Sequence, residues 1–238
     1  MSNSRHEQQL WLELPPISAQ APRRLLVFLH GAGSSPEVFA PVAIAWQLKF
    51  PGATAAILQG LEPAASGSGR DWFDPRGDAQ QRALKVDAAL ETIAQRVQEA
   101  QRQCGATPDE TVLIGFSQGA TVALELARAY PDLGTIVVAY AGRLARPIRG
   151  DERLRATIHL IHGELDSLVP VVHARQALRG LQAGGAQVTL DIIEDGSHTI
   201  GQDMVIVGTT RVLQTIFKGR RRPIDPSGKR EPRPPVLH

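Results

Sequence analysis

The sequence predicts an α/β fold in which a mostly parallel central sheet carries helices on both faces. Short runs of four to seven apolar residues alternate along the chain with longer segments of helical periodicity. Strands in such an alternation are typical of a parallel sheet covered by helices on both sides. A length of 238 residues, 42% of them hydrophobic, is sufficient for one large domain of this class.

Seven segments have the length and apolar content of strands. The first, at residues 9–14, is weaker than the others and is a candidate edge strand. The other six are expected at residues 24–29, 53–58, 111–116, 135–142, 157–163 and 187–195. Because the carboxyl ends of parallel strands meet at one edge of the sheet, functional side chains are expected directly after these segments.

Five segments have helical periodicity, and they lie at residues 37–50, 79–104, 119–130, 171–185 and 202–217. The longest, 79–104, is amphipathic, and its apolar face includes Val86, Leu90 and Ile93. The single cysteine, Cys104, continues this face, so we expect it to be a buried apolar residue. Residues 59–78 form a polar, glycine-rich loop, and no large lid insertion is present in the sequence.

The chain divides into three parts by composition. Residues 1–22 form an N-terminal segment with the candidate edge strand, 23–217 form the main α/β domain, and 218–238 form a tail rich in proline and arginine. The tail is expected to be disordered, because it has too little apolar surface to bury. It holds seven Lys or Arg residues against two acids, within a formal net charge of +2.

The basic tail admits two interpretations: a solvated end, which we favour, or a segment that holds the protein near anionic lipid or RNA. Without the tail the body is close to neutral, so no nucleic-acid-binding domain is expected. The first sixteen residues lack the apolar core of a signal peptide, and no stretch approaches the ~20 apolar residues that span a bilayer. A cytoplasmic location is therefore expected, and a homodimer is kept as a hypothesis for the assembly.

The segment "GFSQG" is the strongest motif in the chain. Ser117 lies between an expected strand and an expected helix, with Gly115 and Gly119 two residues away on either side. This G-x-S-x-G pattern is typical of a sharp turn that holds a nucleophilic serine in a strained conformation. The turn sets the hydroxyl at the positive end of a helix and aims the N–H of Gln118 at a developing oxyanion.

A serine hydroxyl needs a general base, and in this type of sheet the chain order is serine, acid, histidine. Of the seven histidines, His198 alone follows the serine in a loop directly after a strand and beyond a suitable acid. Asp166, a short loop beyond the strand at 157–163, is the preferred acid. Glu164, Asp191 and Asp195 remain alternatives.

The segment "LHGAGSS" follows the first strong strand and is a candidate anion site. Gly31 and Gly33 let the backbone approach a ligand closely, and the N–H of Ala32 is the expected second oxyanion donor. His30 is expected to brace this loop. A plain glycine turn is the alternative interpretation.

Four separated stretches, "LHGAGSS", "WFD", "GFSQGA" and "HGELDSLVP…GSH", resemble the carboxylesterase/phospholipase group of α/β-hydrolases, which includes the acyl-protein thioesterases. The resemblance covers about residues 23–217. It implies the α/β-hydrolase fold, a catalytic triad of Ser117, Asp166 and His198, and oxyanion donors at Ala32 and Gln118. The substrate-binding residues are assigned as Gly31, Trp72, Phe73 and Leu168. For the "WFD" loop, a buried aromatic pair that anchors the loop is an equal alternative.

The sequence therefore predicts a serine hydrolase that cleaves carboxylic esters or thioesters of small or medium acyl chains through an acyl-enzyme intermediate. The expected partner is a small acyl ester or thioester, and no metal or organic cofactor is expected. Alternatives with the same triad are a lysophospholipase, a lactonase or a peptidase. A non-catalytic binding protein of the same fold is a further alternative.

Overall fold

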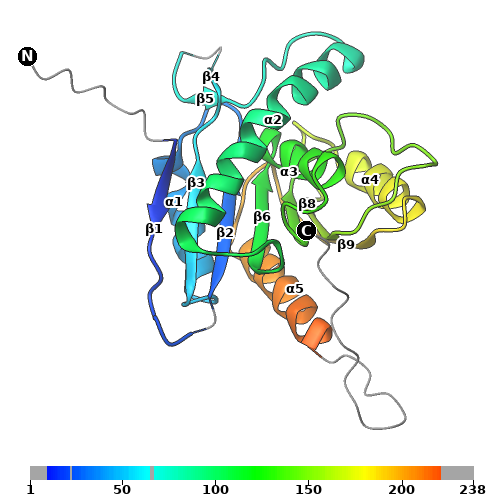
Figure 1. The fold of residues 1–238 in the computed structure, drawn as a ribbon. Helices are drawn as coiled ribbons and strands as arrows, with labels where there is room; N and C mark the ends of the chain where they lie inside the picture. Colours follow the sequence, from blue (N-terminus) through cyan, green and yellow to red (C-terminus); the bar gives the residue numbers. More distant parts are fainter. Residues whose placement is uncertain (1–9, 22, 65–66, 221–238) are drawn as a thin grey trace, which may run out of the picture.

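The protein is described by a computed structural model, which covers residues 10–21, 23–64 and 67–220. These residues form a seven-stranded sheet in the order β1-β3-β2-β6-β7-β8-β9 (Figure 1). β1 pairs antiparallel with β3 at one edge, and every other pair in the sheet is parallel. The predicted fold class is confirmed, and the weak first strand is an edge strand. The strands are β1 (Trp11–Leu14), β2 (Arg24–Leu29), β3 (Ala53–Leu58), β6 (Thr111–Phe116), β7 (Ile136–Tyr140), β8 (Thr157–Gly163) and β9 (Gln187–Ile193).

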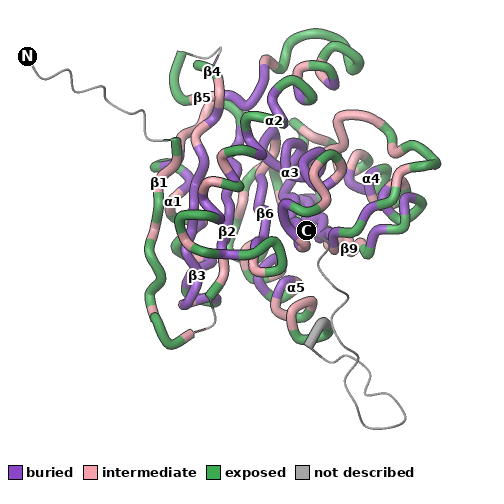
Figure 2. The backbone as a smooth tube through the Cα atoms, viewed as in Figure 1, coloured by how far each residue is buried: buried purple, intermediate pink, exposed green. Residues whose placement is uncertain are grey.

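Helices cover both faces of the sheet. Successive side chains of β2 point to opposite faces and pack alternately in two buried clusters. Leu25, Val27 and Leu29 pack in the cluster that contains α2, α3 and α4. Leu26 and Phe28 pack in the opposite cluster, with α1 and α5. The central strands β2, β3, β6 and β7 are buried along almost their whole length (Figure 2). The helices are α1 (Pro36–Gln47), α2 (Ala79–Cys104), α3 (Gln118–Ala129), α4 (Val172–Ala183) and α5 (Gln202–Arg220).

The predicted bounds of α2 agree with the structure because both helix ends carry capping residues. The Asp78 carboxylate accepts from Gln81 N at 2.8 Å, and the Gln81 side chain accepts from Asp78 N at 3.1 Å. Gly105 ends the helix with a left-handed φ of 64°. Cys104 is only half-buried, and it packs beside the core on the apolar face of α2.

The structure differs from the sequence prediction in three places. The loop at 59–78 contains a small antiparallel pair, β4 (Glu62–Pro63) and β5 (Arg70–Asp71), which is too short to have a periodicity. A short 3₁₀ helix, η1 (Pro108–Glu110), precedes β6. α5 runs to Arg220, beyond the predicted boundary at 217. The rest of the predicted tail, 221–238, lies outside the described residues.

Within the described residues, no helix combines the length and the apolar content that crossing a bilayer requires.

Candidate active site

The turn at Ser117 is as sharp as the sequence predicts. Ser117 has φ 54° and ψ −112°, a left-handed value that residues other than glycine rarely adopt. A Cβ on Gly115 would lie 2.3 Å from Gly119 O, and a Cβ on Gly119 would lie 2.1 Å from Leu29 O. Both glycines are therefore required by close backbone contact: Gly115 meets the start of α3, and Gly119 meets the end of β2.

The structure brings together three side chains that are far apart in the sequence. His198 Nε2 lies 2.9 Å from Ser117 Oγ, and His198 Nδ1 lies 2.7 Å from Asp166 Oδ2. The imidazole is 13% exposed, whereas the Asp166 carboxylate is fully buried. The ring of Phe116 packs against the imidazole with a centroid separation of 5.0 Å. These contacts fix the orientation of the imidazole between an alcohol and a carboxylate.

The loops that carry Asp166 and His198 are held together by their backbones. They follow β8 and β9, which are parallel neighbours at the edge of the sheet. Glu164 N donates to Ile193 O at 2.9 Å, and Leu165 N donates to Gly196 O at 2.8 Å. A Cβ on Gly163 would lie only 2.3 Å from Gly196 O. The relative positions of the acid and the base are thus set by main-chain contacts.

Asp166 accepts hydrogen bonds on both carboxylate oxygens. Oδ1 accepts from the N–H groups of Leu168 at 3.0 Å and Val169 at 2.8 Å, while Oδ2 faces His198. A second histidine, His162, has Nε2 at 3.3 Å from Oδ2 and at 2.6 Å from Val169 O. Burial lowers the pKa of His162, so its neutral ring holds the loop around the carboxylate. Chain order does not favour His162 as the general base. The structure shows that it braces the Asp166 loop instead.

The segment at residues 30–34, which we call the glycine loop, passes beside the serine. A Cβ on Gly31 would lie 2.9 Å from the Phe116 ring and 3.7 Å from Ser117 Cβ. His30 is buried, and its Nε2 accepts from Gly60 N at 3.1 Å, which leaves Nδ1 to donate to Gly31 O at 2.7 Å. Burial lowers the pKa of His30. The neutral His30 ring therefore braces the loop.

A second segment, residues 70–73, supports the glycine loop, and we call it the tryptophan loop. Asp71 Oδ1 accepts from Gly33 N at 2.8 Å, and Trp72 Nε1 donates to His30 O at 2.7 Å. The Gln118 side chain holds the same segment from the helix side. Its Oε1 accepts from Trp72 N at 2.7 Å, and its Nε2 donates to Phe73 O at 2.8 Å.

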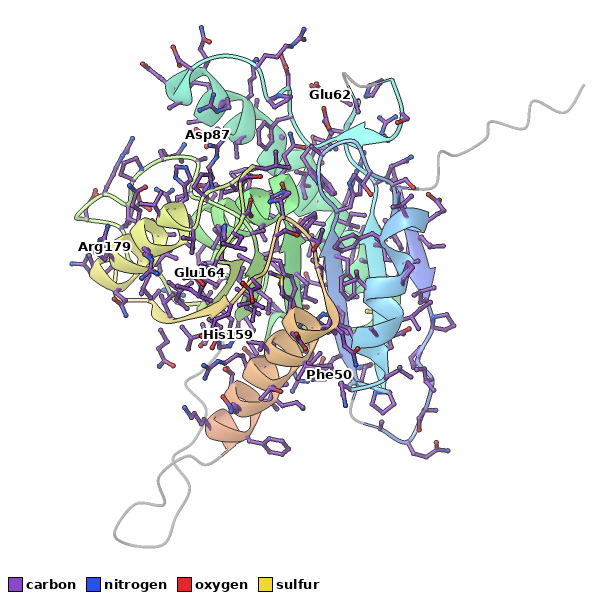
Figure 3. The ribbon with its side chains drawn as sticks, turned by 180° about the vertical axis from the view of Figure 1, so that it is seen from behind. Phe50, Glu62, Asp87, His159, Glu164 and Arg179 are labelled. Atoms are coloured by element: carbon purple, nitrogen blue, oxygen red, sulfur yellow. The ribbon has the colours of Figure 1, made fainter. Side chains whose placement is uncertain are left out.

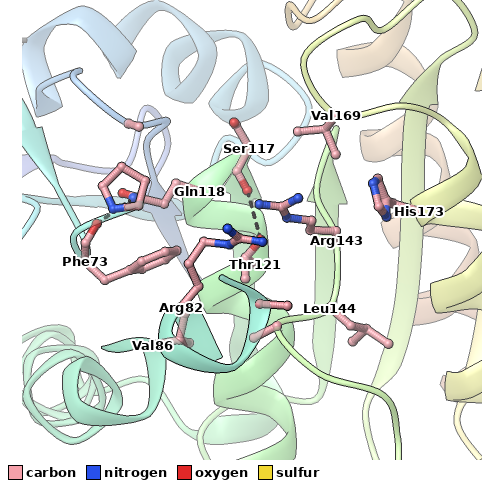
Figure 4. Close-up of a pocket in the computed structure, with 14 residues that line it drawn as sticks. Phe73, Arg82, Val86, Ser117, Gln118, Thr121, Arg143, Leu144, Val169 and His173 are labelled. Carbon is pink, nitrogen blue, oxygen red and sulfur yellow. Dashed lines mark hydrogen bonds between the residues drawn. The ribbon is translucent and has the colours of Figure 1, made fainter. Parts of the chain in front are cut away.

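A pocket of about 310 Å³ opens beside Ser117 (Figure 4). Its lining is mainly apolar, with two arginines and one histidine among the side chains. Ala32 and Gln118, the expected oxyanion donors, both border it. The lining consists of Ala32, Phe73, Pro75, Ala79, Arg82, Val86, Ser117, Gln118, Thr121, Arg143, Leu144, Ala145, Val169 and His173.

Of the four residues assigned to substrate binding, Phe73 lines this pocket and the other three do not. Trp72 is fully buried and anchors its loop, as the alternative interpretation of "WFD" expects. Gly31 lies behind the serine, where it makes room for Phe116. The Leu168 side chain is 73% exposed, and only its backbone N–H contacts the site, through Asp166.

The sequence analysis missed Arg82 and Arg143, which both line the pocket. Arg143 follows β7 closely, so the rule that functional residues follow strands could have identified it. Arg82 lies in the first turns of an amphipathic helix, where a single arginine carries no signal. In the part of the chain that the structure describes, no group of three His, Cys, Asp or Glu side chains is arranged to hold a metal ion.

The parallel sheet, the serine turn after β6 and the histidine loop after β9 define the chain as an α/β-hydrolase. Comparison with known proteins identifies the branch: the phospholipase/carboxylesterase family model matches residues 17–209. The chain belongs to this family and is a hydrolase of the esterase type.

Individual relatives agree with this assignment. Esterase YpfH of Escherichia coli K12 is 37% identical over 197 residues, which are 82% of this chain and 84% of YpfH. The crystal structure of esterase PE8 superposes with a TM-score of 0.78 at 28% identity, covering 86% of this chain and 97% of PE8. The Bacillus cereus carboxylesterase, at a TM-score of 0.70 and 18% identity over 86% of this chain and 93% of its own, shares the fold.

Proposed function

We propose that the chain is a serine hydrolase that cleaves carboxylic esters or thioesters through an acyl-enzyme intermediate. The observation that carries this proposal is the continuous hydrogen-bonded series Ser117–His198–Asp166, with Oγ–Nε2 and Nδ1–Oδ2 distances of 2.9 and 2.7 Å. Such distances are those of a nucleophile, a general base and a carboxylate that orients the base.

In the first half of the reaction, Ser117 Oγ attacks the acyl carbonyl carbon while His198 Nε2 takes the hydroxyl proton. The carbonyl oxygen becomes an oxyanion, which accepts hydrogen bonds from the N–H groups of Ala32 and Gln118. The intermediate then expels the alcohol or thiol, and His198 gives its proton to that leaving group. The products of this half are the free alcohol or thiol and an ester on Ser117.

In the second half, His198 takes a proton from a water molecule as the water attacks the acyl-enzyme carbonyl. The tetrahedral intermediate collapses, the bond to Ser117 Oγ breaks, and His198 returns the proton to the serine. Asp166 stays ionised and stabilises the imidazolium in both halves. Four groups surround its carboxylate: two backbone N–H groups and two imidazoles.

The pocket supports small or medium acyl chains. Its volume of about 310 Å³ is at the lower end of ligand pockets, and Phe73, Val86 and Leu144 give it apolar walls. A lysophospholipase or a peptidase with the same relay is the alternative. A panel of p-nitrophenyl esters, acyl thioesters and peptides separates them, and turnover of amide substrates alone would contradict the esterase proposal.

Labelling with a fluorophosphonate probe tests the nucleophile. We expect the parent protein to be labelled and to hydrolyse p-nitrophenyl butyrate, and we expect Ser117→Ala to lose labelling and at least about 10⁴-fold in kcat. Ser18→Ala, at the opposite end of the sheet next to Pro51, is the matched control and should behave like the parent. Equal labelling of Ser117→Ala and the parent would show that a residue other than Ser117 is the nucleophile.

A further inference from the structure

Two arginines point into the pocket that begins at the serine. Arg82 comes from the start of α2, and Arg143 comes from the segment at residues 141–152, which we call the arginine loop. Figure 4 shows both guanidinium groups within the pocket, between Ser117 and Leu144. His173 lines the same pocket, and no aspartate or glutamate belongs to its lining. The pocket therefore has a cationic wall beside an apolar one.

Two acids near this wall are paired with other cations, and a third, Asp78, caps α2 by accepting from Gln81 N. Asp74 binds Arg76 and Lys85, each at 2.8 Å, and Asp87 binds Arg146. Arg82 donates to the carbonyl of Gly77, which adds no negative charge. Arg143 makes no hydrogen bond or ion pair with any of the described residues. Burial and the neighbouring charge of Arg82 both lower the pKa of Arg143.

The protein holds Arg143 in this unfavourable place by a buried network behind it. Arg128 binds Glu125 at 2.7 Å and Glu152 at 2.8 Å, with Arg128 and Glu125 almost fully buried. Glu125 Oε1 also accepts from Ala145 N at 2.9 Å, and Arg128 donates to Arg146 O at 3.1 Å. These bonds fix the backbone of the arginine loop. Among the described residues no acid lines the pocket beside these two guanidinium groups, which have the charge and the donors that bind an oxyanion.

We infer that the preferred substrates carry an oxyanion, a carboxylate or a phosphate, at a distance from the ester bond, and that Arg82 and Arg143 bind it. This inference rests on the proposed ester hydrolysis. The guanidinium groups hold the anion, and the linking carbons lie against Phe73, Val86 and Leu144. The simplest substrate of this kind is a monoester of a short dicarboxylic acid.

The test compares two esters of equal acyl length, monoethyl adipate and ethyl hexanoate. We expect the ratio of their kcat/KM values, anionic over neutral, to fall by about 10- to 100-fold in Arg143→Gln and in Arg82→Gln, because each loses a charge-assisted hydrogen bond. Arg179→Gln is the matched control: Arg179 lies on α4 outside the pocket lining (Figure 3), and the ratio should be unchanged. A third ester, 2-acetoxyethyl phosphate, distinguishes a phosphate on the alcohol side from a carboxylate on the acyl side.

A binding measurement keeps this inference separate from the proposed function. Free adipate is titrated into Ser117→Ala by calorimetry, with and without Arg143→Gln, so that no turnover is needed. We expect adipate to bind Ser117→Ala and the double variant to bind at least about tenfold more weakly. If the arginine variants hydrolyse both esters in the parent ratio, or adipate binds both proteins equally, the inference is wrong. If no ester is hydrolysed by the parent, the proposed function fails while the adipate titration still decides this point.

Discussion

The glycine loop and the arginine loop border the same serine but are held in different ways. The glycine loop is held by single side chains that bond to backbone atoms: the His30 ring, the Trp72 indole and the Asp71 carboxylate. The Gln118 amide holds the tryptophan loop, which supports it. The arginine loop is held by a buried group of charges, Glu125, Arg128 and Glu152. The first arrangement fixes the direction of backbone N–H groups. The second fixes the segment with Arg143, for which the described residues supply no acid partner.

The difference suits the proposed tasks of the two loops. Oxyanion donors must be fixed before the charge develops, and several hydrogen bonds from side chains to the backbone of the glycine loop do this. Burial and the nearby charge of Arg82 disfavour the charged Arg143, so its loop needs strong anchoring to keep it there. Three changes test the comparison, and the expected effects decrease from the first to the third.

The largest effect is expected from breaking the charged anchor. Arg128→Met leaves Glu125 buried without its partner, so we expect the free energy of unfolding to fall by about 3–5 kcal/mol. Urea unfolding followed by circular dichroism measures it. Arg155→Met removes an exposed pair with Asp132, 76% and 87% exposed, and should change stability by less than about 1 kcal/mol. Equal losses in the two variants would show that the network does not anchor the loop.

An intermediate effect is expected from removing the Gln118 amide, which holds the tryptophan loop. Gln118→Ala keeps the backbone N–H but leaves Trp72 N and Phe73 O without their partner, so we expect a loss of about 1–3 kcal/mol in stability. The tryptophan loop then supports the glycine loop less well, and kcat should fall about 10- to 100-fold with little change in KM. Steady-state kinetics on p-nitrophenyl butyrate measure both constants. Gln103→Ala, whose side chain bonds to Glu99 on the same helix, is the control. An unchanged kcat in Gln118→Ala would show that the tryptophan loop does not support the glycine loop during catalysis.

The smallest effect concerns pH. Burial lowers the pKa of His30 below its usual 6.5, so in mild acid the unfolded chain binds a proton that the folded chain does not. The stability due to neutral His30 is therefore present above pH 6.5 and is lost as the pH falls below it. We expect the free energy of unfolding to fall less steeply in His30→Gln than in the parent between about pH 7.5 and pH 5. Parallel curves would mean that His30 is not held neutral.

Much of the fold and of the site could be predicted because the signals were local or followed a rule of topology. The extent of α2 was predicted from its apolar period, and the structure shows a cap at each end, Asp78 and Gly105. Ser117, Asp166 and His198 could be proposed as candidates because each follows a strand in the expected chain order, and the structure places them side by side. Strand ends meet in space however far apart they are in the sequence, so the residues could be paired without coordinates.

The side chains that shape the pocket could not be predicted in the same way. Trp72 and Phe73 are adjacent, yet one is buried under the glycine loop and the other lines the pocket. Which of the two faces the substrate depends on the Gln118 amide, whose bonds to the loop span more than forty residues of sequence. Leu168 lies in a matching motif but points to solvent. A motif gives a residue its position in the chain, and only packing gives its side chain a direction.

The length of α2 has a structural consequence. Its 26 residues extend about 39 Å, with Arg82 near one end and Gln101 near the other. Gln101 ties the far end to Thr111 and Leu133 through bonds of 2.9 and 2.8 Å. Between these ends the apolar face of α2 packs in the core, so one continuous helix joins the start of β6 to the pocket. Gln101 and Arg82 lie about 28 Å apart along the helix axis, so α2 spans from the pocket to the opposite end of the sheet.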